Sequence, residues 1–335
     1  MNLNQTTGYL PVVAALLGNI IVMVIKFLAA LFSGSVSMFS EAVHSLADTL
    51  NQTLLIIGLR RSLKKPDEVF TYGYGYERFF WALISACGIF FIGAGITIYR
   101  GVMALLEPKE IIVQPLVFIV LLIALAVESV TFLLAARELK RHYPDLSRWQ
   151  RLRVGDPSTL AVLLEDGLAI LGVMIATTAI GLTYLTGSYV WDAVGSIIIG
   201  IFLGVAAVVL IMKNKGYLIG KSIPESMQEK IIELLEADPA IEKVLNFQSN
   251  VLDVGIYRVK CEVEFNGSVL LKEIYKKSSL RAQYQEVKDD YEEFKRFCVD
   301  YADRIPRLVG KRIDDLETKL KKDYPGIKYI DIEIN

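Results

Sequence analysis

The chain has 335 residues, of which 53% are hydrophobic, a positive mean hydropathy and a formal net charge of −1 at neutral pH. A soluble domain of this size disperses its apolar residues at helix or strand periods, but here long apolar runs fill residues 9–213 and most charged residues lie in 214–335. This asymmetry excludes a single soluble domain. It predicts two domains in different solvents, 1–213 in the lipid bilayer and 214–335 in water.

The first domain is predicted to contain six membrane-spanning helices. About 20 mostly apolar residues are needed to cross the hydrocarbon core of a bilayer. Six segments meet this length, near residues 9–32, 36–59, 79–105, 113–136, 160–185 and 189–212. The second and fifth segments contain ionisable residues, so we expect both to line the interior of the bundle.

Basic residues mark the loops on one side of the membrane. The connections at 60–78 and 137–153 are rich in lysine and arginine, whereas the connections on the other side are nearly free of them. Basic loops stay on the cytosolic side of a membrane. We therefore expect a multi-pass protein of the cell (inner) membrane with both termini in the cytosol.

The second domain reads as alternating helices and strands. The pattern predicts a helix near 224–239, strands near 243–249 and 255–265, a long helical stretch over 283–322 and a final strand, KYIDIEIN. These elements are typical of a small α+β layer, with helices on one face of a short sheet.

The second apolar segment carries the first candidate metal ligands. His44 and Asp48 are four residues apart, one helical turn from each other on the same face, and Glu41 lies near that face. Imidazole nitrogen and carboxylate oxygen both suit Zn²⁺. The alternative is that His44 and Asp48 bond to each other and only stabilise packing. The cost of placing ionisable groups in a membrane favours a functional role.

Further acids lie in the remaining apolar segments. Glu165 and Asp166 are adjacent in the fifth, and neighbouring residues of a helix point about 100° apart. One of them could bind metal while the other pairs with Lys26; alternatively both serve as a charge partner and a helix cap. Glu128 has two possible roles, a proton site or a partner for Lys26. Asp192 also has two, a functional role or that of an acid favoured by the positive end of a helix dipole.

These motifs resemble the cation diffusion facilitator family. The resemblance rests on SGSVSMFSEAVHSLADTLNQ with the YGYG loop that follows, and on LLEDGLAILGVMIA with WDAVGSIIIG. It covers essentially the whole chain and is greatest to the branch with the animal mitochondrial zinc transporter. It implies a homodimer that exchanges metal ions for protons across a lipid bilayer, with a ferredoxin-like C-terminal domain and no prosthetic group.

The resemblance also implies a transport site with two residues from the second helix and two from the fifth. His44 and Asp48 match the first pair, and Asp166 matches the second member of the other pair. The first member falls at Val162, which cannot bind a metal ion. The candidate metal ligands are therefore His44, Asp48, Asp166 and Glu165, and the choice between Zn²⁺ and Mn²⁺, Fe²⁺ or Co²⁺ stays open.

The sequence thus predicts a proton-coupled exporter of a divalent cation, with Zn²⁺ favoured as the transported substrate and no enzymatic activity. One alternative is a metal-binding membrane scaffold whose transport site is vestigial, as Val162 allows. An intramembrane metalloenzyme is the other, but no HExxH motif supports it. No nucleic-acid partner is expected. Beyond residue 213 the chain has no histidine and only Cys261 and Cys298 as thiols, which predicts a C-terminal domain without a high-affinity zinc site.

Overall fold

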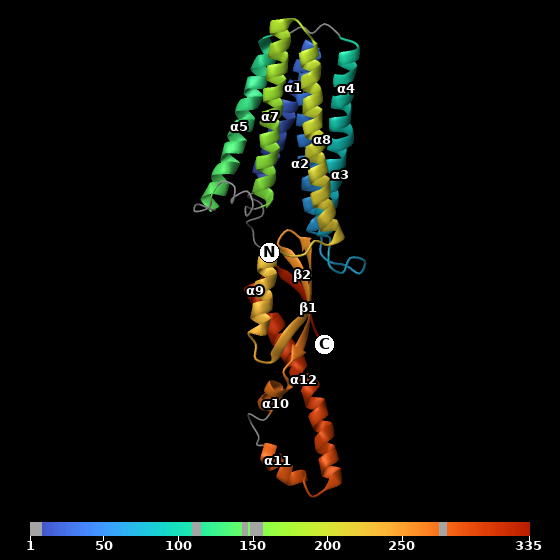
Figure 1. Ribbon diagram of the computed structural model, residues 1–335, viewed down its shortest axis with the longest axis vertical. Coiled ribbons are helices and arrows are strands. Elements are labelled where there is room, and N and C mark those ends of the chain that lie inside the picture. Colours follow the sequence, from blue (N-terminus) through green and yellow to red (C-terminus); the bar gives the residue numbers. More distant parts are fainter. Residues whose placement is uncertain (1–8, 109–114, 143–146, 148–156, 275–279) are drawn as a thin grey trace. The chain divides into compact units, whose positions relative to one another are not determined.

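The structure is a computed structural model that describes residues 9–108, 115–142, 147, 157–274 and 280–335 (Figure 1). Its contacts divide the chain into two compact units. The membrane unit consists of Met1–Arg61 and Glu77–Lys215, and the C-terminal unit of Ser62–Tyr76 and Gly216–Asn335.

The membrane unit is a bundle of long helices. They are α1 (Tyr9–Ser33), α2 (Val36–Ser62), α3 (Tyr76–Gly88), α4 (Gly95–Leu106), α5 (Pro115–His142), α7 (Pro157–Thr186) and α8 (Val190–Ile219). A π-helical turn, η2 (Ile89–Ala94), joins α3 to α4 without a break.

Four described stretches are long and apolar enough to cross a membrane: Tyr76–Leu106, Pro115–Arg141, Glu165–Thr186 and Val190–Ile219. A shorter apolar helix covers Gly18–Ser33. Helix α2 is not among these stretches and carries several polar residues. The number of six membrane-spanning helices therefore stays a prediction.

Small residues let the membrane helices approach one another closely. Gly195 of α8 lies where a Cβ atom would overlap the side chains of Ala179 in α7 and Ser37 in α2. Buried alanines such as Ala47, Ala124 and Ala176 form much of the bundle core. In lipid, helices associate through such close contacts because no hydrophobic force drives them together.

The C-terminal unit is a three-stranded sheet with helices against it. Its elements are α9 (Glu225–Glu236), β1 (Ile241–Asp253), β2 (Ile256–Phe265), α10 (Gly267–Ile274), α11 (Leu280–Val287), α12 (Tyr291–Asp323) and β3 (Ile327–Ile334). The strand order is β1-β2-β3; β1 and β2 are antiparallel, and β2 and β3 are parallel. The small C-terminal sheet confirms the α+β prediction at this level, and the ferredoxin-like assignment stays a prediction.

Alternation along β2 builds the core of this unit. Val259, Cys261 and Val263 are fully buried and pack with Leu235 of α9 and Leu320 of α12. One detail differs from the prediction. The stretch 283–322 belongs to two helices, α11 and α12. Helix α12 continues through Pro306.

The segment Ser62–Tyr76, which follows α2, belongs to the C-terminal unit. The Tyr72 ring packs edge-on against Tyr329 of β3, with ring centroids 5.1 Å apart, and the Arg258 guanidinium carbon lies 4.4 Å from the centre of the Tyr72 ring. A Cβ atom at Gly75 would overlap the Leu252 carbonyl, so glycine is required there. The prediction from sequence places this loop in the domain 1–213, whereas the structure places it in the C-terminal unit. The boundary between 213 and 214 stays a prediction for the rest of the chain.

Candidate metal-transport site

Helix α2 presents one buried polar stripe. Glu41, His44, Asp48 and Asn51 follow one another at spacings of three, four and three residues, which places them on one face. Glu41 is fully buried, and His44 and Asn51 are each 6% exposed. The stripe therefore faces the inside of the bundle along about three helical turns.

A small cavity lies beside this stripe. It has a volume of about 40 Å³, and its polar lining comes from His44 and Asp48 of α2 and Glu165 of α7. The other lining residues are apolar or glycine: Ala47, Ile89, Leu168, Gly172, Ile199, Phe202, Leu203, Ala206 and Leu210. A site needs at least about 10–15 Å³ to admit one water molecule. The cavity therefore has room for a small ion or a few waters.

Both ring nitrogens of His44, which lines the cavity, lack hydrogen-bond partners within the described part of the chain. The same holds for Oε1 of Glu41 and Oδ2 of Asp166, which belong to α2 and α7 but do not line the cavity. The His44 Nδ1 atom is 3.7 Å from Asp48 Oδ1, which is too long for a strong hydrogen bond. An unsatisfied buried polar atom costs about 1–3 kcal/mol. Donor atoms left in this state suit a site that receives a cation.

Two neighbours hold Glu165 in place. The Asn51 side-chain amide donates a hydrogen bond to Glu165 Oε1 at 2.8 Å, and the Ser85 hydroxyl of α3 donates to Asn51 Oδ1 at 3.0 Å. This chain joins α3, α2 and α7 at the level of the cavity. Asn51 follows the spacing of the α2 stripe, whereas no sequence signal identified Ser85.

Glu41 forms an ion pair with Lys26 of α1. The distance from Lys26 Nζ to Glu41 Oε2 is 3.1 Å, and both side chains are fully buried. The sequence analysis offers Glu128 or an acid of the fifth helix as partners for Lys26, but its partner in the structure lies on α2. Gly172 of α7 provides the space, since a Cβ atom there would overlap Glu41 Oε1.

Asp192 of α8 caps the start of α2. Its carboxylate accepts hydrogen bonds from the Ser35 hydroxyl at 2.7 Å and from the backbone N–H groups of Val36 at 2.6 Å and Ser37 at 3.2 Å. The first N–H groups of a helix have no partner within it, and their partial positive charge favours an acid. Asp192 is thus a helix cap, but for α2 and not for its own helix.

The structure separates the two adjacent acids of α7. Glu165 lines the cavity with His44 and Asp48, whereas Asp166 is not among the lining residues. The side chain of Val162 lies outside the described residues. Within the described ranges, no three His, Cys, Asp or Glu side chains are close enough together to hold a metal ion. The ligand set His44, Asp48, Asp166 and Glu165 therefore stays a prediction.

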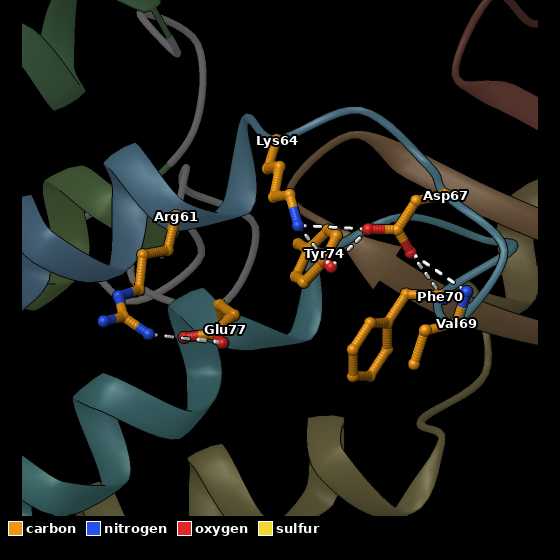
Figure 2. Close-up of polar contacts among 7 residues, drawn as sticks. All are labelled: Arg61, Lys64, Asp67, Val69, Phe70, Tyr74 and Glu77. Carbon is orange, nitrogen blue, oxygen red and sulfur yellow. Dashed lines mark hydrogen bonds and ion pairs between the residues drawn. The ribbon is translucent and has the colours of Figure 1, made fainter.

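Beyond α2, the loop is folded around one carboxylate (Figure 2). Asp67 accepts hydrogen bonds from the Tyr74 hydroxyl at 2.6 Å, the Phe70 N–H at 2.9 Å and the Lys64 ammonium at 3.0 Å. These bonds, led by that from Tyr74, lower the pKa of Asp67 below its usual range. The YGYG motif is therefore part of an ordered turn that bonds to a carboxylate.

The chain matches the family model described as the cation efflux transmembrane domain over residues 12–219. It is 38% identical over 314 residues to the human mitochondrial proton-coupled zinc antiporter SLC30A9, covering 92% of this chain and 55% of that protein. It is 31% identical over 341 residues to metal tolerance protein C4 of Arabidopsis thaliana, covering 99% and 75%. Identity to the cation-efflux pump FieF of Shewanella oneidensis is 22% over 255 residues, covering 75% and 80%. The chain spans about half the length of the mitochondrial relatives.

The expected location in a cell membrane is wrong. The zinc antiporters of human and mouse that this chain resembles at 38% identity are named as mitochondrial. Loop charge indicates which helix ends share one side of a membrane, but it does not identify the membrane. The assignment of the basic side to the cytosol rested on the same argument and falls with it.

The family match covers most of the bundle that surrounds the cavity, and the plant relative is aligned along nearly the whole chain. The predicted resemblance is confirmed. The chain belongs to the cation diffusion facilitator family, polytopic membrane proteins that transport divalent metal cations.

Proposed function

We propose that this protein is a proton-coupled zinc antiporter that moves Zn²⁺ out of the compartment holding its C-terminal unit. His44, Asp48, Glu165 and Asp166 would bind the ion, and the bundle would open to the two sides in turn. The observation that carries the proposal is the small cavity with one imidazole and two carboxylates at its wall. The name of the human relative, a proton-coupled zinc antiporter, points the same way.

The donor atoms explain how protons and metal exchange. A metal ion binds neutral imidazole and ionised carboxylates, so protons and metal compete for the same atoms. The unpartnered nitrogens of His44 are open to either. A site that binds Zn²⁺ on one side and protons on the other converts a proton gradient into metal movement. Asn51 would keep Glu165 turned toward the cavity in both states.

Zinc is favoured by the donor types. Imidazole nitrogen suits Zn²⁺, whereas a site of carboxylates and water alone suits Mg²⁺ or Mn²⁺. The fully buried ion pair of Lys26 and Glu41 lies one turn from His44 on α2. It occupies Oε2 of Glu41, and the adjacent positive charge of Lys26 disfavours a cation there, which leaves His44 and Asp48 as the donors of α2 at the cavity wall.

Flux measurements test the proposal. The purified protein is reconstituted in sealed liposomes with a zinc indicator inside, and a pH difference is imposed across the membrane. Zinc entry should be faster when the liposome interior is more acidic than the outside, because protons then leave as zinc enters. It should slow as the pH of the outside solution, which contains the zinc, falls. Zinc entry indifferent to both pH and the gradient would contradict proton coupling. A well-folded protein without zinc flux would favour the scaffold alternative, and flux of Mn²⁺, Fe²⁺ or Co²⁺ in preference to Zn²⁺ would overturn the choice of metal.

We also propose a homodimer formed through the C-terminal unit. The described sheet has three strands, so its core is small, and a second copy would bury further surface. Light scattering of the protein in mild detergent should give twice the chain mass. Deleting residues 216–335 should yield a monomer, and a full-length monomer at micromolar concentration would contradict the proposal.

The C-terminal unit itself should lack a tight zinc site. Burial raises the pKa of the Cys261 thiol to about 12, so it stays protonated at neutral pH. The thiolate is the form that binds metal. Cys298 is exposed on α12, far along the chain from β2. Calorimetry of the H44A/D48N variant should therefore show no submicromolar zinc binding, and a stoichiometric site in that variant would overturn the prediction.

A further inference from the structure

A second hollow opens on the membrane unit, away from the transport cavity. It has a volume of about 480 Å³ and lies among α1, α2 and α4. Its lining is apolar except for Ser35 and one charged residue, and comprises Val24, Phe27, Leu28, Ala30, Leu31, Gly34, Ser35, Val36, Phe39 and Arg100. Leu28 is 48% exposed and Leu31 is 76% exposed, so the hollow is an open groove. It shares no lining residue with the cavity of His44 and Asp48.

Arg100 is the charged residue of the groove. Its guanidinium carbon lies 4.0 Å from the centre of the Phe39 ring, and within the described ranges no carboxylate forms an ion pair with it. The side chain is exposed although it belongs to an apolar stretch long enough to cross a membrane. A cation within a membrane segment is costly and calls for a partner or for access to the interface.

The groove lies near one end of the membrane bundle. Phe39 is three residues into α2, so Arg100 contacts that helix about 5 Å from its start. The start of α2 is tied to the start of α8 through Asp192. Near this same end, Tyr184 is 68% exposed and Trp191 is 43% exposed. Aromatic side chains of this kind mark the headgroup level of a membrane.

We propose that this groove binds a membrane phospholipid, with its phosphate on Arg100 and an acyl chain along Phe27, Leu28 and Leu31. The guanidinium fork matches two oxygens of one phosphate. Its charge is complementary to that group, and the apolar wall below it suits a hydrocarbon chain. Arg100 lines the groove near the start of α2, at the end of the bundle that also carries Tyr184 and Trp191. The site is separate from metal transport and extends the proposed function.

Lipid binding by the intact protein tests the assignment. The detergent-purified protein is titrated with dioleoyl phosphatidylglycerol, and bound lipid is counted by native mass spectrometry. Dioleoylglycerol supplies the chains without phosphate, and glycerol phosphate supplies the phosphate without chains. A charged hydrogen bond contributes about 1.5–3 kcal/mol, so R100Q should weaken phosphatidylglycerol binding about tenfold or more. R100K, which keeps the charge without the fork, should fall between R100Q and the parent.

R137Q is the matched control, since Arg137 is an exposed arginine near the other end of a membrane helix, α5. It should leave binding unchanged. Equal phosphatidylglycerol binding by R100Q and the parent would overturn the proposal. So would binding of dioleoylglycerol by the parent as tight as its binding of phosphatidylglycerol. Competition by glycerol phosphate at the same concentration as the lipid would indicate a free-anion site and overturn it too. A disulfide that joins Cys side chains at position 31 of two copies of an L31C variant in lipid would show that a second chain fills the groove. That outcome would also overturn the proposal. An unchanged unfolding temperature of lipid-free R100Q checks that the variant is folded.

Discussion

The membrane unit and the C-terminal unit bury opposite kinds of residue. Nearly all the buried polar and charged side chains of the described chain lie in the membrane unit, including Lys26, Glu41, His44 and Asp192. In the C-terminal unit the buried residues are apolar apart from Ser62 and Asp253, and ion pairs such as Lys260 with Glu333 lie toward the surface. Lipid covers the outside of the first unit, so polar atoms must find partners within it. Water covers the second, so its polar atoms stay outside.

The difference separates the buried residues that suit ion transport from the buried residues that stabilise the fold. The polar interior of the bundle contains a cavity and unpartnered donor atoms, which cost stability and suit a transported ion. The C-terminal core contains close-packed leucine, isoleucine and valine, which contribute stability through burial. Substitutions in the two interiors should therefore fail in different ways.

The largest effect is expected from the cavity itself. His44→Ala should reduce zinc flux more than about 100-fold, because even groups that only support a metal ligand contribute 10–100-fold. Its unfolding temperature should hardly change, since neither His44 nitrogen has a hydrogen-bond partner among the described residues. Thr53→Ala on the same helix is the control, because Thr53 does not line the cavity and its hydroxyl donates to the Thr49 carbonyl of its own helix. Zinc flux in H44A equal to that of the parent would contradict the assignment of transport to the polar interior of the bundle.

The next effect concerns stability within the bundle. Lys26→Met leaves Glu41 buried without its partner, and loss of one member of a buried ion pair costs about 3–5 kcal/mol. The double variant K26M/E41L removes both charges and should regain most of that loss. The three tryptophans all lie between Glu77 and Lys215, so tryptophan fluorescence during heating reports on the membrane unit. Equal destabilisation by the single and double variants would contradict this account.

A substitution in the other core sharpens the contrast. Leu235 of α9 is fully buried against the sheet. Leu235→Ala should cost about 2–5 kcal/mol by opening a cavity. Circular dichroism should show earlier unfolding of the C-terminal unit while the tryptophan transition stays in place. Leu245→Ala, at a position 41% exposed, is the control. A shift of the tryptophan transition in L235A would mean that the two units unfold together.

The smallest effect is expected in the loop after α2. The pKa of Asp67 is lowered by its hydrogen bonds from Tyr74, Phe70 and Lys64. Its contribution is therefore present above the ordinary carboxyl pKa, about 3.9, and is lost as pH falls through the lower folded value. The protection of the Val69 and Phe70 amides, measured relative to intrinsic exchange at the same pH, should persist through mildly acid pH and fall only below it. Asp67→Asn should exchange faster at neutral pH, whereas Glu68→Gln should behave as the parent. The groups are exposed, so global stability should change little.

Local patterns predicted much of this molecule. Apolar runs located the helices, alternation located β2, and the turn spacing of α2 placed His44 and Asp48 on one face. Contacts between distant segments were beyond that reasoning. The Lys26–Glu41 pair, the support of Glu165 by Asn51 and Ser85, and the docking of Tyr72 on the sheet all depend on packing between helices or strands. Sequence spacing within one helix does not encode such packing.

The carboxylate of Asp192 restricts the paths that an ion can take. It holds the first residues of α2 to the start of α8 through two backbone N–H groups and one hydroxyl. Pulling these two helix ends apart would leave the buried Asp192 carboxylate and the first N–H groups of α2 without these partners. We expect this corner to behave as a pivot that stays shut throughout the cycle. An ion leaving on that side must then pass between α2 and a different neighbour.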